Sequence, residues 1–194
     1  MTIFKQLFSR AALAFALMAG MGAAWAGPSY HVTLDTSTSG GGDGFLQMDF
    51  LTFGIADPLT ATLTNLQGAF TGTPDLANVA SGANGSLTFS NDAFSEFFQS
   101  VMLGGLFSFD VSFDGTPGGL GNTGFTASLL NAAGDYLSFN AVQIGLSTDG
   151  TTVSTSAIAS VTPSAATDVP EPAELALVMT GLGLMGLMRR RRAA

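Results

Sequence analysis

The chain contains few residues that could carry out catalysis. His31 is its only histidine, and it has no cysteine. Zinc sites, Cys-His pairs and conventional Ser-His-Asp triads therefore lack the residues that they require. The alternating pattern around His31 also places this residue on the solvent face of a strand. Because the residues for these catalytic centres are missing, we predict that the protein is not an enzyme and has no catalytic residues.

The carboxylate pair nearest to a glycosidase arrangement is Asp110 and Asp114. Both lie on one side of a predicted strand, about 13 Å apart at roughly 3.3 Å per residue. Paired glycosidase carboxylates are separated by only about 5 to 9.5 Å. Either aspartate would need a partner from another strand, which makes a secreted glycoside hydrolase the third of three functional hypotheses.

Two further patterns concern cofactors. Gly119-x-Gly121-x-x-Gly124 matches the dinucleotide fingerprint, but it leads into a strand-like segment rather than a helix, and we predict a loop. The Asp-Gly turns offer oxygen ligands without forming a D-x-D-x-D-G calcium loop. The sequence thus predicts no cofactor and no metal ligand, with calcium as the only ion left open. The turns begin at Asp43, Asp114 and Asp149.

Apolar and polar residues alternate with a period of two along much of the chain, which is typical of half-buried antiparallel strands. Turns rich in glycine separate these runs at short intervals. We predict an all-β fold, an antiparallel β-sandwich of the jelly-roll type, with its core between the sheets. The predicted inward-facing residues are Tyr30, Val32, Leu34, Leu59, Ala61, Leu63, Leu87, Phe89, Phe107, Phe109, Val111 and Phe113.

Three segments depart from this simple alternation. Residues 46–53 and 137–146 shift their apolar side chains by one position. Each shift predicts either a β-bulge or a strand that is buried on both faces. Residues 151–167 consist mostly of Ser, Thr, Ala and Val, and after a weakly alternating start they predict a flexible spacer at the domain boundary.

One short helix is predicted between Asp92 and Gly104. Apolar side chains recur there at i, i+3, i+4 and i+7, which is the spacing of one helical face. Asp92 is placed to cap the start of this helix, and Gly104 to end it. The apolar residues are Phe94, Phe97, Phe98 and Val101.

Positive charge is confined to the two ends of the chain. All six Lys and Arg residues lie there, and residues 27–168 carry twelve acidic groups and no Lys or Arg. A phosphate backbone would meet only repulsion, so nucleic-acid binding is excluded. The same count excludes salt bridges within the domain. Because cysteine is also absent, stability must come from burial.

Residues 1–26 are typical of a secretory signal peptide. Two basic residues precede an apolar run of about 13 residues, which is too short to span a bilayer. Ala24 and Ala26 supply the small-residue cleavage pattern, so the mature chain is predicted to begin at Gly27. This pattern predicts export through the Sec translocon and cleavage by signal peptidase.

The C-terminal end carries three signals in a fixed order. Pro170, Glu171 and Pro172 hold the backbone extended, and an apolar segment, 175–188, and four arginines follow. Arginines beside a membrane segment stay in the cytoplasm and leave the preceding domain outside. The segment would form a helix of about 21 Å against a hydrocarbon core of about 30 Å, so we predict a transient anchor. Its main apolar residues are Leu175, Leu177, Val178, Leu182, Leu184 and Leu187, and the orienting residues are Arg189, Arg190, Arg191 and Arg192.

This tail resembles the C-terminal sorting signal of PEP-CTERM proteins. Gram-negative bacteria that make extracellular polysaccharide export these proteins, and a membrane-embedded exosortase recognises their tails. Residues 170–172 match the family's Pro-Glu-Pro motif, 175–188 its membrane segment and 189–192 its basic end. The resemblance implies processing by an exosortase near the motif. The body resembles small proteins of that family, a likeness that assigns it no functional residues.

The sequence therefore divides into four parts. These are a signal peptide (1–26), a β-sandwich domain (27–164), a linker with the Pro-Glu-Pro motif (165–172) and a transmembrane sorting tail (173–194). We predict an exported structural protein of the cell surface or the extracellular matrix of a biofilm. It would reside transiently in the inner membrane of a Gram-negative bacterium.

The alternative hypothesis is a module that binds exopolysaccharide. Exposed aromatic rings often stack on sugars, and rings with a polar group suit a surface that is partly wet. Tyr30 and Tyr136 are the only tyrosines of the chain. This hypothesis rests on analogy with carbohydrate-binding sandwiches and on the polysaccharide association of the resembled family.

Overall fold

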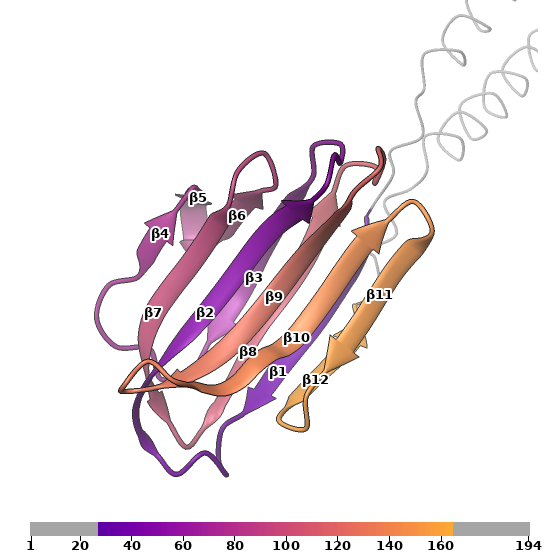
Figure 1. Cartoon of the computed structure of the whole chain (residues 1–194). Coiled ribbons are helices and arrows are strands. Elements are labelled where there is room, and N and C mark those ends of the chain that lie inside the picture. The colour runs from indigo at the N-terminus through magenta and orange to yellow at the C-terminus, as the bar shows by residue number, and fades with distance from the viewer. Residues whose placement is uncertain (1–26, 165–194) are drawn as a thin grey trace, which may run out of the picture. The chain divides into compact units, whose positions relative to one another are not determined.

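Two antiparallel β-sheets pack face to face in the computed structural model, which describes residues 27–164 (Figure 1). Sheet A has the strand order β12-β1-β8-β3-β6-β5, and sheet B has the order β11-β10-β9-β2-β7-β4. Sheet A contains β1 (Ser29–Asp35), β3 (Thr60–Gln67), β5 (Val79–Ser81), β6 (Leu87–Ser90), β8 (Leu106–Asp114) and β12 (Ala159–Pro163). Sheet B contains β2 (Gly42–Phe53), β4 (Asp75–Ala77), β7 (Ser95–Leu103), β9 (Asn122–Asn131), β10 (Tyr136–Ser147) and β11 (Gly150–Thr155).

The first eight strands pair in a nested order. β1 pairs with β8, β2 with β7 and β3 with β6, while the consecutive strands β4 and β5 lie in different sheets. Apart from β4 and β5, which do not pair with each other, this is the order of a long hairpin rolled into two sheets, as in a jelly roll. β9, β10 and β11 then extend sheet B beyond β2, and β12 returns to sheet A beside β1. The predicted antiparallel sandwich is confirmed.

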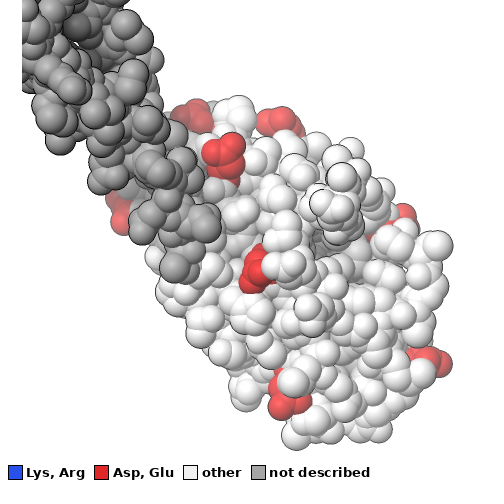
Figure 2. All heavy atoms as spheres, turned by 180° about the vertical axis from the view of Figure 1, so that it is seen from behind, with Lys and Arg blue, Asp and Glu red and all other residues white. Residues whose placement is uncertain are grey.

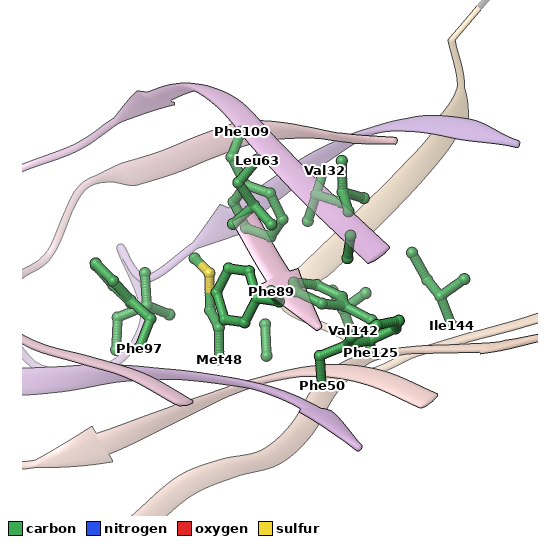
Figure 3. Packing of buried hydrophobic residues seen from close by; sticks show 14 of the residues in the cluster. Val32, Met48, Phe50, Leu63, Phe89, Phe97, Phe109, Phe125, Val142 and Ile144 are labelled. Atoms are coloured by element: carbon green, nitrogen blue, oxygen red, sulfur yellow. The ribbon is translucent and has the colours of Figure 1, made fainter. Parts of the chain in front are cut away.

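The core between the sheets is rich in phenylalanine (Figure 3). The ring of Phe125 lies at its centre, with centroids 6.1 Å from Phe89, 6.1 Å from Phe109 and 6.3 Å from Phe113. All three contacts are edge-on, the geometry that aromatic quadrupoles favour. Every residue that the sequence predicts to face inward is buried here, including Tyr30.

One buried amide joins both sheets at the end of this core. Asn91 follows β6, and its side-chain oxygen accepts a hydrogen bond of 2.7 Å from the backbone N–H of Leu59. Its amide nitrogen donates to the carbonyl of Asp57 at 3.0 Å and to the hydroxyl of Thr123 in β9 at 2.8 Å. A buried amide is tolerated only when it is satisfied in this way, so these contacts fix the relative positions of three segments.

The predicted helix between Asp92 and Gly104 is wrong, because the segment forms β7. Residues 95, 97, 99, 101 and 103 are buried in strict alternation. Phe98 lies on the opposite face, where its ring stacks on Phe45 of β2 with centroids 4.9 Å apart. The helical spacing arose because apolar residues cover both faces of one strand, and pairing with β2 and β4 satisfies the backbone. Within residues 27–164 the helical content is one 3₁₀ turn, Ala83–Gly85.

The two predicted phase changes have different outcomes. In β10 the register shifts between Ser138 and Val142, the adjacent residues Ala141 and Val142 are both buried, and Asn140 has φ of 46°. This is the predicted bulge. In β2 the register with β9 is continuous, so no bulge occurs there. Instead, Phe53 reaches the outer face and is 61% exposed.

The spacer that residues 151–167 predict after their weakly alternating start does not begin before residue 164. Residues 150–155 form β11 and 159–163 form β12, so the sandwich continues to the end of the described range. Apolar contacts to the core are weak here, since all six residues of β11 are exposed. These segments are strands because the backbone of β11 pairs with β10 and that of β12 pairs with β1. The pattern of side chains along the sequence does not reveal such backbone pairing.

Replacement of Phe125 by alanine is expected to destabilise the domain strongly. The change removes three ring contacts from the centre of the core, and large-to-small changes of this kind lower the free energy of unfolding by about 3 to 5 kcal/mol. Urea unfolding followed by circular dichroism measures the loss. Phe94→Ala serves as the control, because Phe94 is 51% exposed and its loss is expected to change stability by less than about 1 kcal/mol. Equal effects of the two variants would contradict the assigned core.

Candidate functional site

Strand alternation presents a row of polar side chains on the outer face of sheet B. Phe45, Gln47 and Asp49 of β2 point away from the core, since Leu46, Met48 and Phe50 are buried between the sheets. The register places Glu96 of β7 directly opposite Asp49 on one side, and Thr126 of β9 opposite it on the other. Opposed residues on neighbouring strands have Cβ atoms about 5 Å apart. Two carboxylates are therefore neighbours on this face.

Hydrogen bonds connect this group of residues, which we call the Asp49 cluster: Gln47, Asp49, Glu96, Thr126 and Tyr136. The Tyr136 hydroxyl at the start of β10 donates to Gln47 Oε1 at 3.1 Å. Gln47 Nε2 in turn donates to Glu96 Oε1 at 2.6 Å. Thr126 donates a long hydrogen bond of 3.5 Å to Asp49 Oδ2. Within residues 27–164 no donor reaches the buried Oδ1 of Asp49.

This environment raises the pKa of Asp49 to about 6. Partial burial is the largest cause, because it removes water from the charged form, and the neighbouring Glu96 carboxylate adds repulsion. The bond from Thr126 opposes both effects. The Asp49 cluster can therefore hold a proton in mildly acidic solution and becomes a pair of adjacent negative charges at neutral pH. Such a pair can attract a cationic group or act as acid and base towards a bound molecule.

A second polar group lies on the outer face of sheet A. His31 of β1 is opposite Asp110 of β8, and His31 Nδ1 is 2.6 Å from Asp110 Oδ1. Asn65 Nδ2 donates to the other oxygen of Asp110 at 2.6 Å, and the Thr33 hydroxyl is 3.5 Å from His31 Nε2. The side chains of His31 and Asp110 are 49% and 32% exposed. The predicted solvent position of His31 is thus confirmed.

The electrostatics of this second group differ from those of the Asp49 cluster. Hydrogen bonds from Asn65 and then from His31 lower the pKa of Asp110 below its ordinary value of 3.8. The stability they contribute is therefore present at neutral pH and is lost as the pH falls through the folded-state pKa. The exclusion of salt bridges from the charge count is wrong at this point, because protonated His31 forms an ion pair with Asp110.

The other sequence motifs are explained by the fold. Gly119 and Gly121 lie in the loop between β8 and β9, as predicted, and Gly124 lies within β9. A Cβ on Gly121 would be 2.5 Å from the Phe53 carbonyl oxygen, so this position needs glycine for close backbone approach. Asp114 ends β8 and is not brought beside Asp110 by any bend of the strand.

In the part of the chain that the structure describes, no three His, Asp or Glu side chains converge as a metal centre would require. The sequence predicts no metal ligand and leaves calcium at the Asp-Gly turns open. Among residues 27–164 there is also no helix long and apolar enough to cross a membrane. The sorting predictions fall outside the described residues: the cleavage-site residues Ala24 and Ala26, the Pro170–Pro172 motif, the apolar segment and the terminal arginines.

Sequence reasoning missed the Asp49 cluster because its members are far apart along the chain. Asp49 and Glu96 become neighbours only through the β2–β7 register, and Glu96 lies in a segment that the sequence analysis assigned to a helix. Alternation did contain one usable signal. Asp49 sits between Met48 and Phe50 on a strand, which already places it on the outer face.

The fold and its outer faces define an acidic, antiparallel β-sandwich of jelly-roll order. Figure 2 shows the side turned away from the viewer in Figure 1, with isolated acidic side chains on a mainly uncharged surface. No protein-family model matches the chain, and comparison with curated proteins and with solved structures found no similar protein. Functional inference therefore depends on the residues themselves.

Replacement of Asp49 by asparagine is expected to stabilise the domain at neutral pH. The folded-state pKa of about 6 lies above the ordinary value of 3.8, so the wild-type domain loses stability as the pH rises through about 6. The full difference corresponds to about 3 kcal/mol, and solvent screening of this half-buried group reduces it to about 1 to 2 kcal/mol. Urea unfolding at pH 4 and pH 7.5 measures the effect.

The stabilisation by Asp49→Asn should disappear near pH 4, where the wild-type side chain is also neutral. Asp114→Asn, at the exposed end of β8, is the matched control for loss of one carboxylate. An Asp49→Asn variant that is equally stabilised, or destabilised, at both pH values would contradict the raised pKa.

Proposed function

We propose that the protein is an exported structural component of the cell surface or extracellular matrix, sorted by a PEP-CTERM-type tail and processed by an exosortase. The observation that carries this proposal is the order of three signals at the C-terminus: Pro170-Glu171-Pro172, the apolar segment 175–188 and Arg189–Arg192. The arginines orient the tail with its end in the cytoplasm, so that the sandwich lies outside.

The extent of the sandwich supports this division of the chain. β1 begins at Ser29, two residues after the predicted cleavage before Gly27, and β12 ends at Pro163. These terminal strands pair with each other, and the core that the structure describes is formed by residues between Tyr30 and Val161. Removal of both flanking segments by signal peptidase and exosortase would leave every core strand in place.

The surface chemistry of the sandwich also fits an extracellular structural role. Residues 27–164 carry eleven carboxylates and no Lys or Arg, which favours solubility and disfavours binding to anionic polymers. The chain needs no disulfide, since apolar burial between the sheets stabilises it. Its partners in this proposal are the Sec translocon, signal peptidase and the exosortase.

Intact-mass spectrometry of fractionated cells tests the sorting proposal. In a Gram-negative host with an exosortase, the exported protein is expected to begin at Gly27 and to lack Arg192. Replacement of Pro170, Glu171 and Pro172 by alanine should cause the untrimmed tail to accumulate in the inner membrane. Pro117→Ala, in the β8–β9 loop, is the control for loss of a proline and should leave trimming unchanged.

Two results would contradict the sorting proposal. One is an exported product that retains all four terminal arginines. The other is identical release of the wild-type chain and of a chain that ends at Ser164.

A second candidate function is binding of exopolysaccharide at the outer face of sheet B. The observation that favours it is the position of Tyr136, which is 49% exposed and forms an edge-on pair with Phe139, itself 65% exposed. The tyrosine hydroxyl also contacts Gln47 of the Asp49 cluster, so rings and hydrogen-bonding groups are adjacent. Tyr30 cannot serve this role, because its ring is buried against Phe113.

Tyr136→Ala is expected to weaken retention of the protein on the producer's polysaccharide by about 5-fold, since an aromatic contact contributes about 1 kcal/mol. Tyr136→Phe keeps the ring and should retain most of the binding. Phe94→Ala removes an exposed ring elsewhere and is the control. Affinity electrophoresis in gels that contain the polysaccharide measures retention. Unchanged retention of Tyr136→Ala would reject this face, and release of reducing ends would instead favour the hydrolase hypothesis.

A further inference from the structure

The two edges of sheet B differ in how well they are protected against pairing with another strand. The edge strand β4 has only three residues and carries the charge of Asp75. At the other edge, β11 has six residues, Gly150–Thr155, and all six are exposed. Among the strands of residues 27–164, β11 has nothing beyond it in sheet B (Figure 1). One edge is therefore short and charged, while the other is longer and open.

An open edge strand presents unpaired backbone N–H and C=O groups. Proteins usually protect such edges with lysine, proline, a bulge or a very short strand. β11 contains no charged residue and no proline, and its register with β10 is continuous from Gly150 to Thr155. Its side chains are mainly β-branched, which suits a strand in the interior of a sheet. None of the usual protective features is present in β11.

The distribution of charge favours another copy of this chain as the partner. The eleven carboxylates of residues 27–164 lie between residues 35 and 149, with no Lys or Arg in this range to balance them, so two copies repel each other wherever these groups approach. The three strands β10, β11 and β12 carry no charged side chain, and β12 lies beside β11 across the sandwich. At this edge two copies can approach without like charges on the facing strands.

The turn that precedes β11 favours one direction of pairing between two β11 strands. Asp149 immediately precedes Gly150 in the β10–β11 turn. Parallel pairing of two β11 strands would place both Asp149 carboxylates side by side. Antiparallel pairing places each Asp149 near Thr155 of the other copy, so that the two carboxylates are separated by about the length of the strand, roughly 20 Å. Antiparallel pairing also produces a closed, two-fold dimer.

We propose that β11 pairs antiparallel with β11 of a second copy, so that sheet B continues across a two-fold axis. The contact covers Val153, which is 43% exposed in one copy, and satisfies the backbone groups of both edges. This inference goes beyond the proposed structural function and does not depend on sorting. A protein that forms such pairs can contribute cohesion to an extracellular matrix.

The absence of cysteine from the chain makes a direct cross-linking test possible. Single cysteines are introduced in the full-length chain, kept in detergent, at each of residues 151–155, and disulfide formation is followed on gels. Antiparallel pairing predicts covalent dimers with one maximum along β11, at the residue nearest the two-fold axis. Ser81→Cys, on the exposed edge strand β5 of sheet A, is the matched control and should cross-link only at background level.

Charge variants provide the second measurement. Val153→Glu places two like charges near the two-fold axis, and sedimentation analysis should show dimer affinity reduced by about 10-fold or more. Thr152→Glu provides an independent variant on the other face of the strand, while Ser81→Glu should leave association unchanged. Circular dichroism confirms that each variant is folded.

Three outcomes would overturn the proposal. These are cross-linking no greater than that of Ser81→Cys, equal cross-linking at all five positions, and dimer formation unaffected by Val153→Glu and Thr152→Glu. Intact mass measures trimming of the tail, and that result is independent of whether the chain forms dimers.

Discussion

Burial of apolar side chains between two sheets is the interaction on which the rest of this structure depends. Residues 27–164 contain no Lys, no Arg and no cysteine. Neither ion pairs of Lys or Arg with carboxylates nor disulfides can therefore compensate for a weakened core. The contacts of Phe125 with Phe89, Phe109 and Phe113 connect β9 of sheet B to β6 and β8 of sheet A. Because strands alternate, fixing the inner side chains also fixes every outer one. The positions of the surface groups follow from the core.

The eleven carboxylates of the domain have no Lys or Arg to stabilise their charge. Two of them show how the surrounding residues raise or lower the pKa of a carboxylate. Asp110 receives hydrogen bonds from Asn65 and His31, which lower its pKa. Asp49 has one buried oxygen without a donor from the described residues and a second carboxylate opposite it, and its pKa is raised. The same residue type thus behaves in opposite ways on the two sheets, because donors favour the charged form and desolvation disfavours it.

The distribution of charge also connects the proposals for sorting and for association. Basic residues occur only in the terminal segments, where their role would be to direct export, and the exported domain would retain only negative charge. A surface of this kind discourages random aggregation. Specific contact then requires a neutral region, and β11 with its neighbouring strands supplies one. The aromatic and polar groups near Tyr136 lie at the start of β10, before the residues of β10 that pair with β11, so glycan binding and self-association would use different residues.

The amino-acid sequence determined which positions of most strands are buried and that the apolar pattern of β10 changes phase, because both depend on residue type and local spacing. Tertiary structure alone decided that the segment around Phe98 is a strand, since that ring finds Phe45 only through the β2–β7 register. The same register brings Glu96 to Asp49, and pairing with β10 makes a strand of a Ser/Thr-rich segment that resembles a spacer. Local periodicity reports which side of an element is apolar, whereas partners depend on the alignment of strands that are distant in sequence.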